Sequence, residues 1–138
     1  MTFVLDNSVA LAWCFEDEHT PLLLALLQRV EESGAAAPNL WPLEAVNGLF
    51  VAERRGRLDA ARRRRLQTFL EMLPISIDGE TTARVWTAIA RLAEEWRLSA
   101  YDAAYLELAD RRGLPLASLD RQLRNAANGL GVPLIALE

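Results

Sequence analysis

The chain has 138 residues, about half of them hydrophobic (51%) and a quarter charged (25%), with a formal net charge of −4. This size fits one compact domain spanning residues 1–138. No apolar run reaches the roughly 18 residues of a membrane-spanning helix, and no signal peptide is visible, so we expect a cytoplasmic protein without a membrane partner. A single cysteine and a single histidine exclude a disulfide scaffold and a cysteine-based zinc site.

The lysine and histidine content excludes further kinds of catalytic mechanism. The chain contains no lysine, which excludes P-loop and Schiff-base mechanisms. His19 lies in a polar stretch before Pro21, so we expect a surface histidine rather than the partner of a serine or cysteine nucleophile.

Short apolar segments alternate with helical patterns along the whole chain. In chain order the sequence predicts strand 2–5, helices 9–15 and 21–32, strand 35–38, helices 40–55 and 58–73, strand 74–78, helices 80–96 and 100–112, strand 114–119, helix 121–130 and strand 132–136. This alternation predicts an α/β fold with a parallel sheet covered by helices on both faces.

Several helix ends carry recognisable signals. Pro21 stands at a predicted helix start and Gly34 just past its end. Asn39 is the expected N-cap of the next helix. Residues 40–73 are expected to form a helical hairpin that turns around Gly56.

Aromatic and small residues suggest how some helices pack. Helix 80–96 is expected to be amphipathic, and the four tryptophans are expected in the core rather than in base stacking. The apolar stripe predicted for this helix consists of Ala83, Trp86, Ala90 and Ala93.

Four carboxylates occupy positions where a site can form. Asp6 and Asp120 each follow a predicted strand, Asp102 lies in the first turn of a helix, and Glu44 lies one turn into another. Ligand sites of open α/β sheets lie outside the carboxyl ends of the strands. Taken singly, the three aspartates could instead cap helices or complement helix dipoles, whereas Glu44 on a partly apolar face needs a partner.

A cluster of four carboxylates requires a cation. Two carboxylates about 5 Å apart repel by about 3 kcal/mol at an effective dielectric constant of about 20. Ligand sets made only of oxygen favour Mg²⁺ or Mn²⁺, and such ions usually act on phosphates.

At this point the sequence resembles a known family, the PIN-domain nucleases. Four segments match, and they follow the family's order over essentially the whole chain. They are Phe-Val-Leu-Asp-Asn-Ser at 3–8, Pro-Leu-Glu-Ala-Val-Asn at 42–47, Ser-Ala-Tyr-Asp-Ala-Ala-Tyr-Leu at 99–106 and Leu-Ala-Ser-Leu-Asp-Arg-Gln-Leu at 116–123. In the last segment Ser118 stands where the family usually has threonine. The short length and the 99–106 segment look most like the VapC-like toxin ribonucleases of VapBC-type toxin–antitoxin pairs.

This resemblance implies a three-layer α/β/α sandwich with four to five short parallel strands. It also implies endonucleolytic cleavage of RNA with Mg²⁺ or Mn²⁺, a homodimer, and inhibition by a cognate antitoxin. By residue-wise comparison Asp6, Glu44, Asp102 and Asp120 would hold the metal and position the attacking water. Side chains expected to orient these carboxylates are those of Ser8, Asn47 and Ser118.

One segment is strongly basic although the chain as a whole is acidic. Residues 54–65 hold seven arginines and one aspartate, whereas the rest of the chain has eight arginines and eighteen acidic residues. Such a patch attracts a phosphate backbone, but it could equally be a solvated face or contact an acidic antitoxin. The candidate RNA-binding residues are Arg54, Arg55, Arg57, Arg62 and Arg65.

Two other classes of function compete with the nuclease. A catalytically silent RNA- or protein-binding module of the same fold would be expected to have lost a carboxylate, and none of the four is missing. A phosphoryl-accepting receiver relies on a lysine, and the related phosphatase motif needs an aspartate at the position of Ser8.

Overall fold

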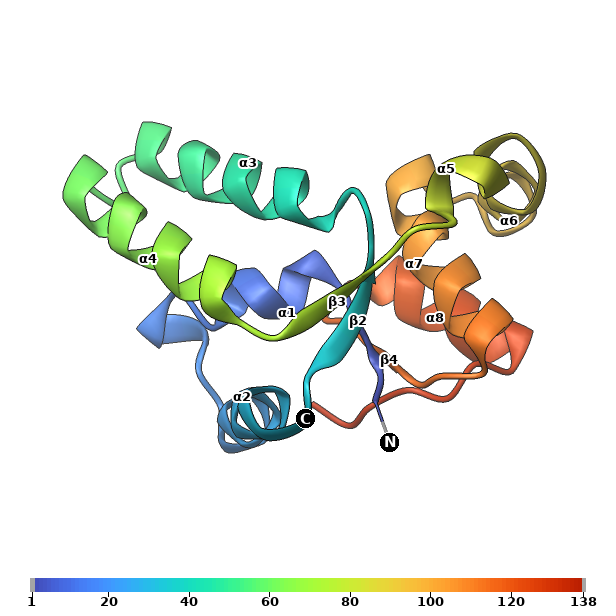
Figure 1. Ribbon diagram of the computed structural model, residues 1–138, viewed down its shortest axis with the longest axis horizontal. Coiled ribbons are helices and arrows are strands. Elements are labelled where there is room, and N and C mark those ends of the chain that lie inside the picture. Colours follow the sequence, from blue (N-terminus) through green and yellow to red (C-terminus); the bar gives the residue numbers. More distant parts are fainter. Residues whose placement is uncertain (1, 138) are drawn as a thin grey trace.

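Four parallel strands lie at the centre of the computed structural model, which describes residues 2–137 (Figure 1). Their order across the sheet is β3-β2-β1-β4, so β1 lies between β2 and β4. The strands are β1 Val4–Leu5, β2 Ala35–Pro38, β3 Ile75–Asp78 and β4 Leu116–Ala117.

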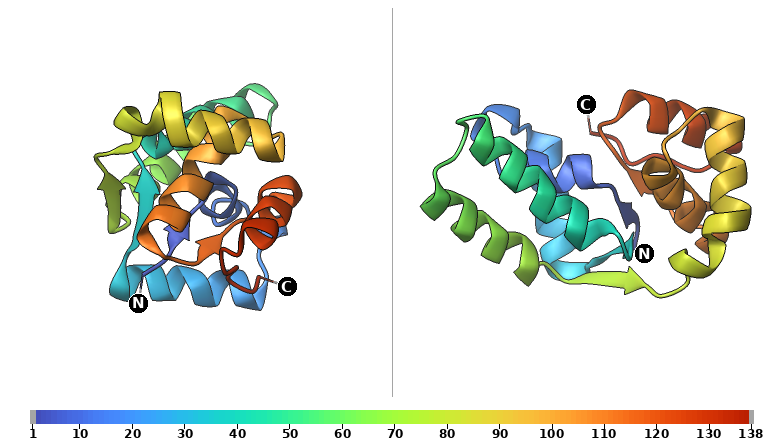
Figure 2. Two further views of the ribbon diagram at one scale, coloured as in Figure 1. Left: turned by 90° about the vertical axis from the view of Figure 1, so that its right-hand side faces the viewer. Right: turned by 90° about the horizontal axis from the view of Figure 1, so that it is seen from above.

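The central strands are apolar because helices cover them on both sides. Every residue of β1, β2 and β4 is buried, as expected for parallel strands with no solvent-facing side. Val4 is in register with Ala36 on one side and with Leu116 on the other. Helices enclose the sheet (Figure 2), which confirms the predicted three-layer α/β/α arrangement.

The helices follow the predicted order with small shifts at their ends. Two short irregular turns, Glu16–Glu18 and Val85–Ile89, lie between regular helices. The regular helices are α1 Asn7–Ala12, α2 Pro21–Ser33, α3 Trp41–Arg54, α4 Ala60–Met72, α5 Thr81–Arg84, α6 Ala90–Trp96, α7 Ala100–Arg112 and α8 Arg121–Leu130.

Two helical features position the rest of the molecule. Helices α3 and α4 lie side by side as the predicted hairpin at one end of the molecule (Figures 1 and 2). Helix α7 packs against β1, β2 and β4 and is buried from Ala103 to Ala109. A central helix of this kind can present side chains to a site at the edge of the sheet.

The signals around α2 act as predicted. The Thr20 hydroxyl accepts a hydrogen bond from the Leu23 amide (3.2 Å), and Pro21 opens the helix. Gly34 ends it with a φ of 75°, and a Cβ there would lie 2.8 Å from the Pro74 carbonyl oxygen. Only glycine fits this turn without strain.

One predicted strand and one predicted helix cap are wrong. Segment 132–136 is not a strand, because it contributes only an isolated bridge between Leu116 and Leu134. Asn39 does not cap α3, whose N-cap is Leu40. Its side chain instead donates to the Thr82 hydroxyl (3.0 Å), which ties the β2–α3 loop to α5.

The predicted helix 80–96 is also interrupted. A π-helical turn at Val85–Ile89 separates α5 from α6. Ile89 and Leu92 are buried, while Trp86 is 89% exposed, so the predicted stripe through Trp86 is wrong. Trp13 and Trp41 are buried, as expected.

His19 is only partly exposed, and its Nε2 lies 2.9 Å from the Trp13 carbonyl oxygen. Within residues 2–137, no helix is long and apolar enough to cross a membrane.

Candidate functional site

The sheet order places two of the four carboxylates together. Strand order reverses at β1, and the crevice beyond the carboxyl ends of β1 and β4 is where open α/β sheets bind ligands. Asp6 directly follows β1, and its amide donates to the Ala117 carbonyl oxygen of β4 (3.0 Å). Asp120 follows β4 by three residues, so both aspartates lie at this crevice.

Two serine hydroxyls hold Asp6 in place. Ser8 and Ser118 each donate to Oδ2 of Asp6, at 2.6 and 2.8 Å. The same hydroxyls accept from the loop after β4: Ser118 from the Asp120 amide (3.0 Å) and Ser8 from the Leu119 amide (2.9 Å). The carboxylate of the β1 loop is thus tied to the β4 loop.

Asp120 has the helix-capping role that the sequence left open. Its Oδ1 accepts a hydrogen bond from the Leu123 amide (2.8 Å), which caps α8. The carboxylate has a second oxygen, so the cap does not exclude a role in the site. Both interpretations of Asp120 are compatible with this geometry.

Glu44 and Asp102 approach the crevice from two helices. Glu44 lies in the first turn of α3, and its Oε1 accepts a hydrogen bond from the Tyr105 hydroxyl (2.7 Å). Tyr105 is fully buried on α7, three residues after Asp102 and therefore on the same side of that helix. Burial and the Glu44 carboxylate raise the pKa of the Tyr105 hydroxyl, so it remains a donor.

The electrostatics show that the four carboxylates interact. Burial and then the charge of Asp120 raise the pKa of Asp6 despite the serine hydrogen bonds. Burial, followed by Asp6 and Asp102, raises the pKa of Glu44. Burial, followed by Asp6 and Asp120, raises the pKa of Asp102 to about 6. Each of the three aspartates therefore disfavours the charged form of a neighbouring carboxylate, and a bound cation would relieve this repulsion.

The sequence did not indicate Tyr105 or Asn7 as parts of this site. The Asn7 side-chain amide donates to the backbone oxygen of Glu44 (3.4 Å), and its Oδ1 is buried without a partner among the described residues. Asn47, which was expected to orient a carboxylate, is exposed and forms no hydrogen bond within residues 2–137 that would link it to the site. The only available signals were that Asn7 follows Asp6 and that Tyr105 shares a helix face with Asp102.

The residues present fit a hard divalent cation. All donors at the crevice are oxygens, which suit Mg²⁺ or Mn²⁺. The unpartnered Asn7 Oδ1 can accept a hydrogen bond from water around such an ion. As the side chains lie within residues 2–137, no three acidic, histidine or cysteine side chains are grouped closely enough to hold a metal ion.

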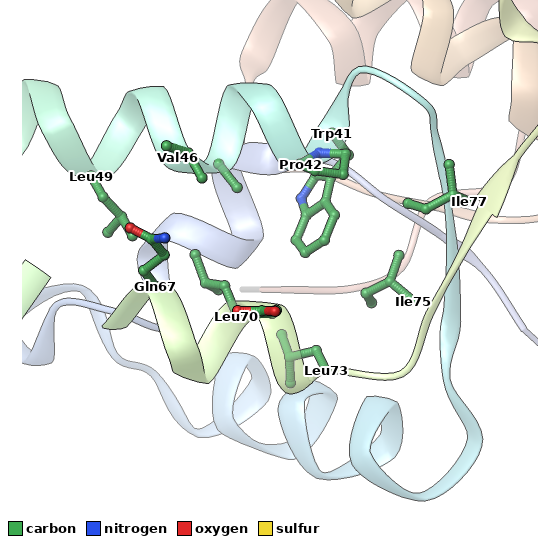
Figure 3. A pocket seen from close by; sticks show the side chains of 11 residues that line it. Trp41, Pro42, Val46, Leu49, Gln67, Leu70, Leu73, Ile75 and Ile77 are labelled. Atoms are coloured by element: carbon green, nitrogen blue, oxygen red, sulfur yellow. The ribbon is translucent and has the colours of Figure 1, made fainter. Parts of the chain in front are cut away.

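A separate cavity of about 430 Å³ lies between α3, α4 and β3 (Figure 3). Trp41, Val46, Leu70, Ile75 and Ile77 are among the side chains that line it. None of the four carboxylates is part of this lining, so we place the chemistry at the crevice and not here.

Comparison with known proteins agrees with this geometry. The PIN domain family model matches residues 3–129. The chain therefore belongs to the PIN domain family, whose members are generally nucleases. No curated protein matches the chain in sequence.

Two solved structures are similar along nearly the whole chain. PAE2754 from Pyrobaculum aerophilum has a TM-score of 0.66 and 28% sequence identity, over 91% of this chain and 86% of that one. FitAcB from Neisseria gonorrhoeae has a TM-score of 0.68 and 17% identity, over 98% and 97% of the two chains. At 17% identity the second similarity concerns the fold alone.

Proposed function

We propose that the protein is a Mg²⁺- or Mn²⁺-dependent endoribonuclease that acts as the toxin of a toxin–antitoxin pair. The observation that carries the proposal is the position of Asp6, Glu44, Asp102 and Asp120 around the switch point of a PIN-domain sheet, where neighbouring carboxylates raise the pKa values of Asp6, Glu44 and Asp102. A divalent ion there would activate water and stabilise charge on the phosphate oxygens.

The chain's own side chains would prepare this site. The four carboxylates would hold the ion, while Ser8 and Ser118 fix the direction in which Asp6 points. The Tyr105 hydroxyl fixes Glu44 in the same way. Such supporting hydrogen bonds orient metal ligands and limit their freedom.

The toxin role and its partners rest on resemblance. The 99–106 segment and the short chain are similar to VapC-like toxins, which are cytoplasmic, form homodimers and are inhibited by a small antitoxin. We propose the same partners for this chain. A short neighbouring reading frame that encodes a DNA-binding protein would support the pairing.

The direct test is RNA cleavage under controlled metal conditions. We expect the purified protein to cut single-stranded RNA with Mg²⁺ or Mn²⁺, to lose activity in EDTA and to recover it when metal is returned. Internally cleaved fragments on a gel would establish endonucleolytic cutting. Equal cleavage with and without EDTA would contradict the metal-dependent mechanism.

Tyr105→Phe tests whether the hydroxyl positions Glu44. Removing this donor while keeping the ring should preserve the fold, because the buried ring is retained. We expect Mn²⁺ affinity, measured by calorimetry, to fall by about tenfold. Tyr101→Phe is the matched control, since Tyr101 is 63% exposed on the same helix. Equal affinity in both variants would remove Tyr105 from the site.

A further inference from the structure

A groove with a volume of about 430 Å³ leads away from the carboxylate crevice. Ser8 and Asp120 lie at its crevice end. Leu11 of α1 lines one side, and Val51 and Arg55 of α3 and its C-cap line the other. We call this hollow the α1–α3 groove.

One face of α3 serves both the crevice and the groove. Glu44, Gly48, Val51 and Arg55 are spaced by four, three and four residues, which places them on one stripe of the helix. The rise from Glu44 to Arg55 along the helix axis is about 16 Å. The stripe that brings a carboxylate to the crevice therefore ends in a cation.

Gly48 lets the Leu11 side chain of α1 lie directly against α3 in the middle of the groove. A Cβ at this position would lie 2.4 Å from Cδ1 of Leu11, so even alanine would crowd the opposite side. Glycine in a helix interior costs about 1 kcal/mol relative to alanine. Close approach of α1 to α3 along the groove offsets that cost.

The two arginines of the groove differ in their partners. Arg57 forms ion pairs with Asp17 (3.1 Å) and Glu18 (3.4 Å), and its guanidinium lies 3.9 Å from the centre of the Phe15 ring. Arg55 is exposed, and its side chain forms no hydrogen bond or ion pair with any described residue. The uncompensated charge of the groove is therefore on Arg55.

A second hollow continues the groove toward the tip of the hairpin. Phe15 and Arg57 line both hollows, and Arg62 lines the second one. The Arg62 side chain, like that of Arg55, forms no ion pair within residues 2–137. Three carboxylates also line the path, Glu18 in the groove and Glu16 and Asp17 in the second hollow, and Arg57 pairs with Glu18 and Asp17. The path thus begins at the crevice carboxylates and passes two arginines that form no ion pair within residues 2–137.

We propose that the α1–α3 groove binds the single-stranded RNA that flanks the cleaved phosphate, with a backbone phosphate on Arg55 and the strand continuing toward Arg62. This inference rests on the proposed ribonuclease function. A strand whose phosphate lies at the metal must leave the crevice along a surface, and this groove starts at Ser8 and Asp120. Its apolar sides at Leu11 and Val51 suit the faces of bases.

An acidic protein segment is the competing occupant. It would satisfy Arg55 and Arg62, but its own carboxylates would be repelled at the crevice end, where the charges of Asp6 and Asp120 already raise the pKa of Asp102. The RNA phosphate at the crevice would be attracted by the proposed metal ion, and the flanking phosphates by the two arginines. The charge pattern therefore favours RNA.

The test compares Arg55→Ser and Arg62→Ser with Arg64→Ser, an exposed position on α4 that lines neither hollow. Binding of a fluorescein-labelled single-stranded RNA is followed by anisotropy over a salt series, in an Asp102→Asn background with Mg²⁺. We expect Arg55→Ser to weaken binding about tenfold and to lower the slope of log K against log salt by about 0.7. Arg64→Ser should stay within about twofold of its parent.

Cleavage by the same substitutions in the otherwise native protein separates the two hypotheses. If the native protein cuts RNA and Arg55→Ser raises KM with little change in kcat, the groove assignment stands. If the native protein cuts RNA but Arg55→Ser and Arg64→Ser behave alike, only the groove assignment is overturned. The same holds if Arg55→Ser leaves RNA binding intact and abolishes binding of an acidic protein. Failure of the native protein to cut or bind RNA overturns the proposed function itself.

Discussion

Asp102→Asn is expected to lower the rate of RNA cleavage by roughly a thousandfold while leaving the fold intact. The substitution removes one negative charge from the crevice, and a bound metal ion contributes several kcal/mol of transition-state stabilisation. Asp102 is partly exposed in the first turn of α7, and the Ser99 hydroxyl caps this helix by accepting a hydrogen bond from the backbone amide of residue 102 (3.1 Å), which the substitution keeps. The helix cap is therefore preserved.

Asp110→Asn is the matched control for this experiment. Asp110 is exposed near the other end of α7, so the variant loses the same charge from the same helix. We expect its cleavage rate to stay within a factor of about two of the native rate. A comparable loss in both variants would point to a general charge effect and not to a catalytic cluster.

Arg111→Met is expected to destabilise the protein by roughly 3 kcal/mol without touching the carboxylate crevice. Arg111 forms ion pairs with Asp78 (2.8 Å) and Glu107 (2.7 Å), which are 8% and 4% exposed. It also reaches Glu80 at 3.1 Å. Arg84 also pairs with Glu107 (3.8 Å) and Glu80 (3.2 Å), but Arg111 is the cation that reaches Asp78, so its removal leaves that buried carboxylate unpaired.

The same variant should show an altered response to pH. Burial would raise the pKa of Asp78, but the hydrogen bonds and charge of Arg111, with bonds from Glu80 and Thr81, hold that pKa below its usual value of 3.8. In the native protein this contribution is complete above the usual pKa and is lost as pH falls through the lowered one. In Arg111→Met the deficit should be largest at neutral pH and should shrink toward pH 4 as the unpaired acids take up protons.

Urea unfolding at pH 7 and pH 4.5 measures both effects. Arg112→Met is the control, because Arg112 is the next residue and is exposed. It should change the free energy of unfolding by less than about 0.5 kcal/mol. If Arg111→Met were equally mild, the ion pairs would contribute nothing to stability.

The sequence predicted the parts of the site that depend on local pattern. Asp6 and Asp120 follow short apolar segments, and strand ends of a parallel sheet share one edge, so their proximity could be expected. Glu44 was expected to need a partner, but the partner could not be found, because Tyr105 is 61 residues away in the chain. Contacts at such separation depend on helix packing, which periodicity does not encode.

The failures have similar physical causes. Segment 85–96 packs against α7, and the face that it buries carries Ile89 and Leu92, so Trp86 on another face is exposed. The segment before Leu134 was apolar enough for a strand, yet it forms a single bridge to β4. Asn39 has a side chain that can cap a helix, but its amide donates a hydrogen bond to the Thr82 hydroxyl on α5 instead. In each case a tertiary contact outweighs a local preference.

Glu44 and Arg55 share a stripe of α3, so the number of residues between them determines whether both side chains leave the helix on the same side. Inserting one residue between them would turn Arg55 by about 100° around the helix axis, away from α1, while Glu44 stayed in place. An insertion of seven residues would nearly restore the angle and lengthen the path instead. We therefore expect insertions in the hairpin to be tolerated more readily beyond Arg55 than within the turns that precede it.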